Sequence, residues 1–202
     1  MEQVDRALVD FVAEYAGRGI LDLGCGLGGY SRALAERGFA VKALDVEPEY
    51  IERARALGVD AELYDGERIP LGDGSVDTVI LLEVLEHLDD PGALLREARR
   101  VARGGVLVTT PNCTQDFGDV PVDFTHMLDV DHRQFFTESS LRRLLDDVFG
   151  SSVVEQTAPI DRHLAGMVLP QPFRALHRWL DGAGILKPRV FFRLRGRAPA
   201  RS

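Results

Sequence analysis

The chain has few cysteines and no long apolar run. Its 202 residues include two cysteines, Cys25 and Cys113, so neither a disulfide framework nor a zinc cluster can be built from cysteine. No stretch approaches the roughly 18 apolar residues of a membrane-spanning helix. The first residues also lack the basic segment and apolar stretch of a secretory signal. We therefore expect a cytoplasmic protein without a transmembrane segment.

Positive charge is scarce outside the C-terminal part of the chain. The net charge is −8, yet residues 160–202 hold nine Lys or Arg and two Asp or Glu, whereas residues 1–159 hold fifteen and thirty. An acidic body repels phosphates, so no nucleic acid partner is expected. The basic C-terminal residues, Arg174 and Arg178 among them, either attract an anionic or membrane-surface acceptor or balance the acidic body, and we favour the second interpretation.

A glycine-rich segment, ILDLGCGLGG (20–29), is the most informative feature that is present. It predicts a buried strand, a sharp loop and a helix start, and VKALD (41–45) predicts a second strand that ends in Asp45. A loop that turns sharply and lets a ligand touch backbone N–H groups cannot carry Cβ atoms. The segment therefore predicts a nucleotide-binding βαβ unit.

Two ligands fit the glycines. Gly24, Gly26 and Gly29 satisfy the G-x-G-x-x-G pattern of dinucleotide binding, with Asp45 as the ribose-binding acid. Asp22 argues against this, because a carboxylate beside the helix start would repel a pyrophosphate and attract a positively charged nucleoside ligand. S-adenosylmethionine, with its sulfonium and ammonium groups, has that character.

Asp22, Gly24, Gly26 and Gly28 form D-x-G-x-G-x-G, which resembles the first motif of class I S-adenosylmethionine-dependent methyltransferases. The resemblance continues through EVLEHLDDP (83–91), GGVLVTTPN (104–112) and DHRQFFTESSLRRLLDDVFG (131–150), which are similar to the ubiquinone-biosynthesis-like branch of these enzymes. It covers about residues 16–157. The resemblance implies a set of cofactor-binding residues: Asp22, Gly24, Cys25, Gly26, Gly28, Asp45, Val46, Asp65, Gly66, Glu83 and Val84.

The order of expected elements predicts one α/β domain spanning residues 1–202. Strands that alternate with helices predict a Rossmann-like, doubly wound, mainly parallel sheet, and the resemblance implies seven strands with an antiparallel closing strand. We expect four parts: an N-terminal helix (1–16), a cofactor-binding half (17–112), an acceptor-side loop (113–137), and a C-terminal half (138–202) that contains an inserted helical segment (161–183). A helix is expected from Asp90 to Arg103 and a last strand over 189–195.

Methyl transfer to a hydroxyl requires proton removal, and two histidines are candidate bases. His132 stands beside Asp131, which could orient it, and next to the aromatic residues Phe135 and Phe136. His87 lies in the segment that would border the transfer site. Each has a plain alternative as a structural or surface histidine. These histidines favour oxygen as the acceptor atom.

The remaining candidate residues give weaker evidence of a functional role. Aspartates over 116–131, with His126 and His132, make a magnesium site possible but unlikely, and solvated acids are the favoured interpretation. Cys25 fits its loop because it is small. The sequence thus predicts methyl transfer from S-adenosylmethionine to a small or medium-sized, sugar or lipid-like acceptor. Two alternatives stay open: an NAD(P)-dependent oxidoreductase, and a non-catalytic S-adenosylmethionine-binding partner subunit.

Overall fold

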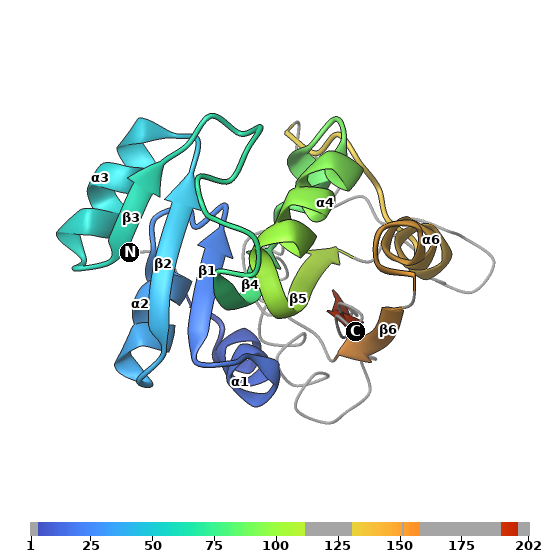
Figure 1. The fold of residues 1–202 in the computed structure, drawn as a ribbon, viewed down its shortest axis with the longest axis horizontal. Helices are drawn as coiled ribbons and strands as arrows, with labels where there is room; N and C mark the ends of the chain where they lie inside the picture. Colours follow the sequence, from blue (N-terminus) through green and yellow to red (C-terminus); the bar gives the residue numbers. More distant parts are fainter. Residues whose placement is uncertain (1–3, 112–130, 151, 158–190, 198–202) are drawn as a thin grey trace, which may run out of the picture.

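The computed structural model describes residues 4–111, 131–150, 152–157 and 191–197. One seven-stranded sheet organises them (Figure 1). The first half of the chain forms α1 (Arg6–Tyr15), β1 (Gly19–Leu23), α2 (Gly29–Glu36), β2 (Ala40–Asp45), α3 (Pro48–Ala56), β3 (Asp60–Leu63) and β4 (Val76–Leu82). The remaining elements are the short 3₁₀ helix η1 (Leu85–His87), α4 (Pro91–Val101), β5 (Ala102–Pro111), α6 (Glu138–Phe149), β6 (Ser152–Thr157) and β7 (Phe191–Arg197). The expected inserted segment, 161–183, and most of the acceptor-side loop lie outside the described residues.

The strand order is β3-β2-β1-β4-β5-β7-β6. Strands β3 to β5 in this list pair in parallel, so the predicted Rossmann-like, mainly parallel sheet is confirmed. β7 pairs antiparallel with both β5 and β6. The chain adds β2 and β3 on one side of β1 and then crosses to β4 on the other. Ligands of such sheets bind at this switch point, beyond the carboxyl ends of the strands.

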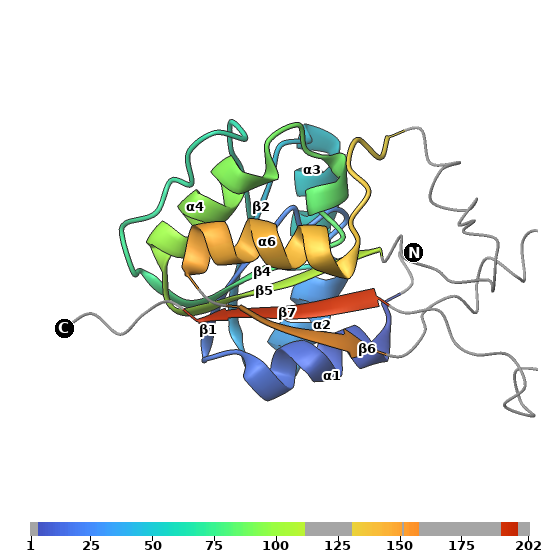
Figure 2. The same cartoon turned by 90° about the vertical axis from the view of Figure 1, so that its right-hand side faces the viewer.

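Helices cover both faces of the sheet. Figure 2 shows α1 and α2 on one face and α4 and α6 on the other. On the α4 and α6 face, side chains such as Leu95 and Leu145 pack against Leu21 and Val79. On the opposite face, Val12 and Leu34 pack against Ile80. The strands are therefore buried on both sides, which explains their nearly continuous apolar sequences.

The helix expected to reach Arg103 ends two residues earlier, at Val101. Ala102 already pairs with Val76, and the Arg103 guanidinium forms an ion pair of 2.6 Å with Asp77. A Cβ at Gly104 would lie 2.7 Å from the backbone oxygen of Asp77. Because Ala102 and Gly104 lie against β4, β5 begins directly after the last residue of α4.

Local capping explains where α6 begins and ends. Thr137 and Ser140 form a capping box at its start, and Gly150 ends it with a φ of 79°.

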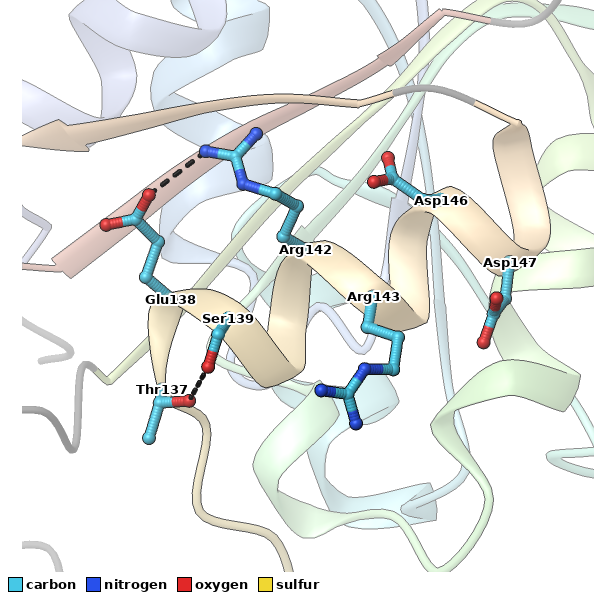
Figure 3. Close-up of a pocket in the computed structure, with 7 residues that line it drawn as sticks. All are labelled: Thr137, Glu138, Ser139, Arg142, Arg143, Asp146 and Asp147. Carbon is cyan, nitrogen blue, oxygen red and sulfur yellow. Dashed lines mark hydrogen bonds and ion pairs between the residues drawn. The ribbon is translucent and has the colours of Figure 1, made fainter.

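Along its polar face, α6 lines a hollow of about 540 Å³ (Figure 3). None of the predicted site residues lines this hollow. Within the described ranges, no helix is long and apolar enough to cross a membrane.

Candidate active site

The loop after β1 has the backbone that its glycines predict. Gly24, Gly26 and Gly28 adopt φ values of 79°, 52° and 82°, a region that side chains with a Cβ rarely enter. The N–H groups of Gly24 and Cys25 donate to the Leu44 carbonyl oxygen at 2.8 and 3.1 Å. The loop is thereby fixed to the end of β2.

The carboxylate of Asp45 is oriented before any ligand binds. Its Oδ2 accepts from the Gly26 N–H at 2.8 Å, and its Oδ1 accepts from the Glu47 N–H at 3.0 Å. The residue is 6% exposed. Each carboxylate oxygen has lone pairs beyond these bonds. Asp45 therefore joins the glycine loop to the start of α3 and still has acceptor capacity.

Asp22 lies inside the fold, 2% exposed, on β1. Its Oδ2 accepts a hydrogen bond of 2.5 Å from the Ser31 hydroxyl in the first turn of α2. The sequence predicts a place in the cofactor site for Asp22 but gives no signal for Ser31. The serine is nine residues from the aspartate, and no spacing rule points to it.

The third predicted acidic position, Asp65, follows β3. Its Oδ1 accepts from the N–H groups of Glu67 and Arg68 at 2.9 and 3.0 Å, and these bonds lower the pKa of the carboxyl. Burial, with the nearby carboxylates of Asp45 and Asp65, raises the pKa of Tyr64 to about 12. The negative charges of Asp45 and Asp65 thus act on the same tyrosine. Val46 and Leu63 beside them are half exposed and offer an apolar surface.

Glu83, the residue after β4, has an unusual backbone conformation and an unusual side-chain environment. Its φ of 58° is rare for a residue with a side chain. Among the described residues, its Oε1 is the buried side-chain atom without a hydrogen-bond partner. Val84 packs against the glycine loop, since a Cβ on Gly24 would lie 2.7 Å from its Cγ2. An unpartnered buried carboxylate oxygen at this edge suits a ligand group that carries positive charge.

Glu86 is a buried carboxyl that the sequence analysis missed. It is 2% exposed, and its Oε2 accepts from the Thr110 hydroxyl at 3.0 Å. Burial raises the pKa of Glu83 and Glu86, and the charge of Glu83 raises that of Glu86 further. Helical spacing could not have found the pair, because Glu83 has a φ of 58° and lies before η1, which begins at Leu85.

The two histidines are neighbours, although 45 residues separate them. Their ring centroids lie 4.8 Å apart in an edge-to-face arrangement. The Nδ1 of His87 lies 3.2 Å from the Asp131 carbonyl oxygen. A carbonyl accepts only, so Nδ1 carries the proton, and in the neutral ring the lone pair is on Nε2. His87 can therefore present a base or a metal-binding nitrogen.

Glu86, His87 and His132 form a single cluster. One potential ligand atom from each lies within 4.8 Å of the others. The cluster could hold a divalent cation. The magnesium site considered from the sequence relied on His132, which is part of this cluster, and on His126 and aspartates that lie, except for Asp131, outside the described residues.

Backbone contacts hold the His132 segment against η1. The N–H groups of Arg133 and Gln134 both donate to the Glu86 carbonyl oxygen, at 2.7 and 2.9 Å. Arg133 also forms an ion pair with Asp89. These contacts fix the position of His132 relative to the turn after β4.

Comparisons with known proteins agree with this geometry. Residues 21–109 match the model of a methyltransferase domain family. The ubiquinone biosynthesis O-methyltransferase of Xanthomonas oryzae pv. oryzae is 34% identical over 107 residues, 48% of this chain and 45% of that protein. The 2-methyl-6-phytyl-1,4-hydroquinone methyltransferase of a Synechocystis strain is 36% identical over 115 residues, 54% and 36% of the two chains.

The fold is shared with solved methyltransferase structures. The crystal structure of a SAM-dependent methyltransferase from Archaeoglobus fulgidus superposes with a TM-score of 0.66 at 19% identity, covering 94% of this chain and 90% of that one. Residues 21–109 carry a methyltransferase domain, and the findings together support the class I S-adenosylmethionine-dependent type. It spans less than half the length of the curated relatives named here.

S-adenosylmethionine is the cofactor of this family. The methyltransferase domain fits it on two observations: the glycine loop has the backbone that close ligand approach requires, and the Glu83 carboxylate has a buried oxygen without a partner. The resemblance predicted by the sequence is confirmed. The individual cofactor-binding and catalytic residues remain predictions.

Proposed function

We propose that the methyltransferase domain transfers the methyl group of S-adenosylmethionine to a hydroxyl oxygen of a small or medium-sized acceptor, with a histidine as base. The observation that carries the proposal is the meeting of His87 and His132 directly after the turn that bears Glu83. When bound, the cofactor would supply an activated methyl carbon. The protein would then have to orient the acceptor and take its proton.

The cofactor would be held by groups from four strand ends. The glycine loop would leave room for it, and Asp45 would accept from the ribose hydroxyls. Asp65 and Gly66, beside Val46, would face the adenine, and the Glu83 carboxylate would face the positively charged part of the ligand. Asp22 acts through Ser31 and the start of α2, and so positions the loop. Calorimetry should show binding of S-adenosylhomocysteine, and tight NAD binding without it would favour the oxidoreductase alternative.

The proton would pass from the acceptor hydroxyl to a ring nitrogen. His132 is the first candidate and His87 the second; the His87 Nδ1–H contact to Asp131 leaves Nε2 able to accept a proton. The names of the relatives make phenols and hydroquinones the first acceptors to test. Sugars and other lipid-like hydroxyl compounds come next.

Alanine variants of the histidines test this role. General base catalysis contributes about 10²–10⁴-fold, so His132→Ala or His87→Ala should lower kcat by that factor while S-adenosylhomocysteine affinity stays unchanged. Gln134→Ala is the control, because it alters the same segment without removing an imidazole. A structural histidine would lower thermal stability and cofactor affinity together. Near-normal kcat in both variants across pH 6–9 would favour a carbon, amine or already deprotonated acceptor.

A divalent cation at Glu86, His87 and His132 is a second candidate, supported by the clustering of their ligand atoms. A bound cation would lower the pKa of an acceptor hydroxyl. Two imidazole ligands favour a transition metal over magnesium. Activity that EDTA abolishes and Mn²⁺ or Zn²⁺ restores, with cation binding lost in His87→Ala and His132→Ala, would support it. Full activity in EDTA would exclude it.

A further inference from the structure

Arg100 and Glu97 form a partly exposed junction between α4 and the loop that follows β3. The Arg100 Nε and Nη2 donate to the two oxygens of Glu97 at 2.8 and 2.7 Å. Nη2 also donates to the Ile69 carbonyl oxygen at 2.9 Å, and Nη1 donates to the Leu71 carbonyl oxygen at 2.8 Å and to Asp73 at 3.0 Å. A guanidinium has five N–H donors, so each of them has an acceptor.

The junction holds both backbone groups of Ile69. Its N–H donates to Oε2 of Glu97 at 3.1 Å, and its carbonyl oxygen accepts from Arg100. The Gly74 N–H donates to the Arg100 carbonyl oxygen at 2.9 Å. Ile69 itself is 1% exposed in the core. Two side chains of α4 thus form the hydrogen bonds to the Ile69 backbone that a neighbouring strand would otherwise form.

The other end of this loop is fixed as well. The Tyr64 N–H donates to the Asp45 carbonyl oxygen at 3.1 Å, and Asp65 follows at once. The bonds from Glu67 and Arg68 to the Asp65 carboxylate turn the chain back toward Ile69. A loop of four residues between two fixed ends has few conformations. The orientation of the Asp65 carboxylate therefore depends on where Ile69 is held.

We propose that Arg100 and Glu97 are positioning residues that set the Asp65 carboxylate for recognition of the adenine amino group. The proposal rests on the proposed function, in which Asp65 faces the adenine. Neither residue touches the cofactor; both act through Ile69 and the loop. A lysine at position 100 would keep the charge but could not make the fork of bonds to Glu97 and two carbonyl oxygens.

The test compares two ligands that differ at the group Asp65 would read. S-adenosylhomocysteine carries the exocyclic amine, and S-inosylhomocysteine carries a carbonyl oxygen there. Their affinities are measured by calorimetry for the wild type, Arg100→Lys and Glu97→Gln, with the Tm of each protein. Arg99→Lys is the matched control, because Arg99 lies on the same helix but donates to the Val148 carbonyl oxygen in α6.

We expect the wild type to prefer S-adenosylhomocysteine. In Arg100→Lys and Glu97→Gln its affinity should fall by about tenfold, as for the loss of one hydrogen bond, while affinity for the inosine compound changes less than about twofold. Arg99→Lys should keep the wild-type ratio even if its Tm falls. An unchanged ratio in both junction variants, whatever their Tm, would overturn the inference. A wild type that binds neither ligand would instead overturn the proposed function.

Discussion

The glycine loop after β1 and the turn after β4 end at the same edge of the sheet, but they are built in different ways. The loop is organised by contacts over about 20 residues, such as Gly26 with Asp45. The turn places its polar groups by contacts over about 45 residues, such as His87 with Asp131. Several N–H groups of the loop have partners within the protein, whereas the turn holds a strained Glu83 with an unpartnered oxygen. The loop is fixed by these internal bonds, and the turn keeps polar capacity for a ligand.

The largest expected effect is on the loop side, at Gly28. An alanine there would meet the Cβ of Ala54 at 2.7 Å and its Cα at 3.0 Å, at a φ of 82°. Steric overlap and the left-handed backbone together should lower the free energy of unfolding by about 2–5 kcal/mol. Gly38→Ala is the matched control, since Gly38 has a φ of 93° but nothing within 4 Å of the added Cβ. Urea denaturation should show a loss for Gly38→Ala of only about 1–2 kcal/mol. Equal losses would contradict the packing argument.

Asp45 tests whether the loop and the ribose share one carboxylate. Asp45→Ala removes the acceptor of the Gly26 and Glu47 N–H groups and the predicted ribose contacts. S-adenosylhomocysteine affinity should fall by tens to hundreds of fold, which corresponds to about 2–3 kcal/mol. Calorimetry measures it, with the exposed neighbour Glu47→Ala as control. Unchanged affinity would remove Asp45 from the site.

Glu83 tests the other region through pH. Burial raises its pKa to about 7 from an ordinary 4.5, so the folded protein holds this proton more tightly than the unfolded chain does. The free energy of unfolding should therefore fall as pH rises from about 4.5 to 7, by about 1–3 kcal/mol, in the absence of ligand. Glu83→Gln should reduce this fall in urea denaturation at pH 5 and pH 8 without abolishing it, because burial also raises the pKa of Glu86. The exposed Glu52→Gln should leave it intact, and a slope in Glu83→Gln equal to that of the wild type would show that Glu86 alone causes it.

The smallest effect concerns the ion pair between Asp89 and Arg133. Both side chains are largely exposed, so Asp89→Asn should change stability by less than about 1 kcal/mol. The backbone bonds to the Glu86 carbonyl oxygen would still hold the His132 segment. Thermal denaturation, together with an unchanged kcat, checks this. A marked loss of kcat would mean that the ion pair, and not the backbone, positions His132.

Sequence patterns were sufficient where neighbours in space are also close along the chain. The order of strands and helices, the glycine loop and Asp45 follow from local turn chemistry and apolar periodicity, because a glycine with positive φ or a buried strand has a signature in its own few residues. The last strand was predicted over 189–195 and lies at Phe191–Arg197. The helix end at Val101 was missed because the approach of Gly104 to Asp77 on β4 decides it.

By itself the sequence determined the family, the cofactor class and the cofactor-side edge of the sheet, since these depend on short motifs whose residue types are set by backbone shape and charge. Only the tertiary structure decided that Ser31 supports Asp22, that Glu86 is buried beside Glu83, and that His87 and His132 lie side by side. It also joined Arg100 to Ile69. Burial and contact between distant segments depend on how the strands are ordered and packed, and no single stretch of residues encodes that order.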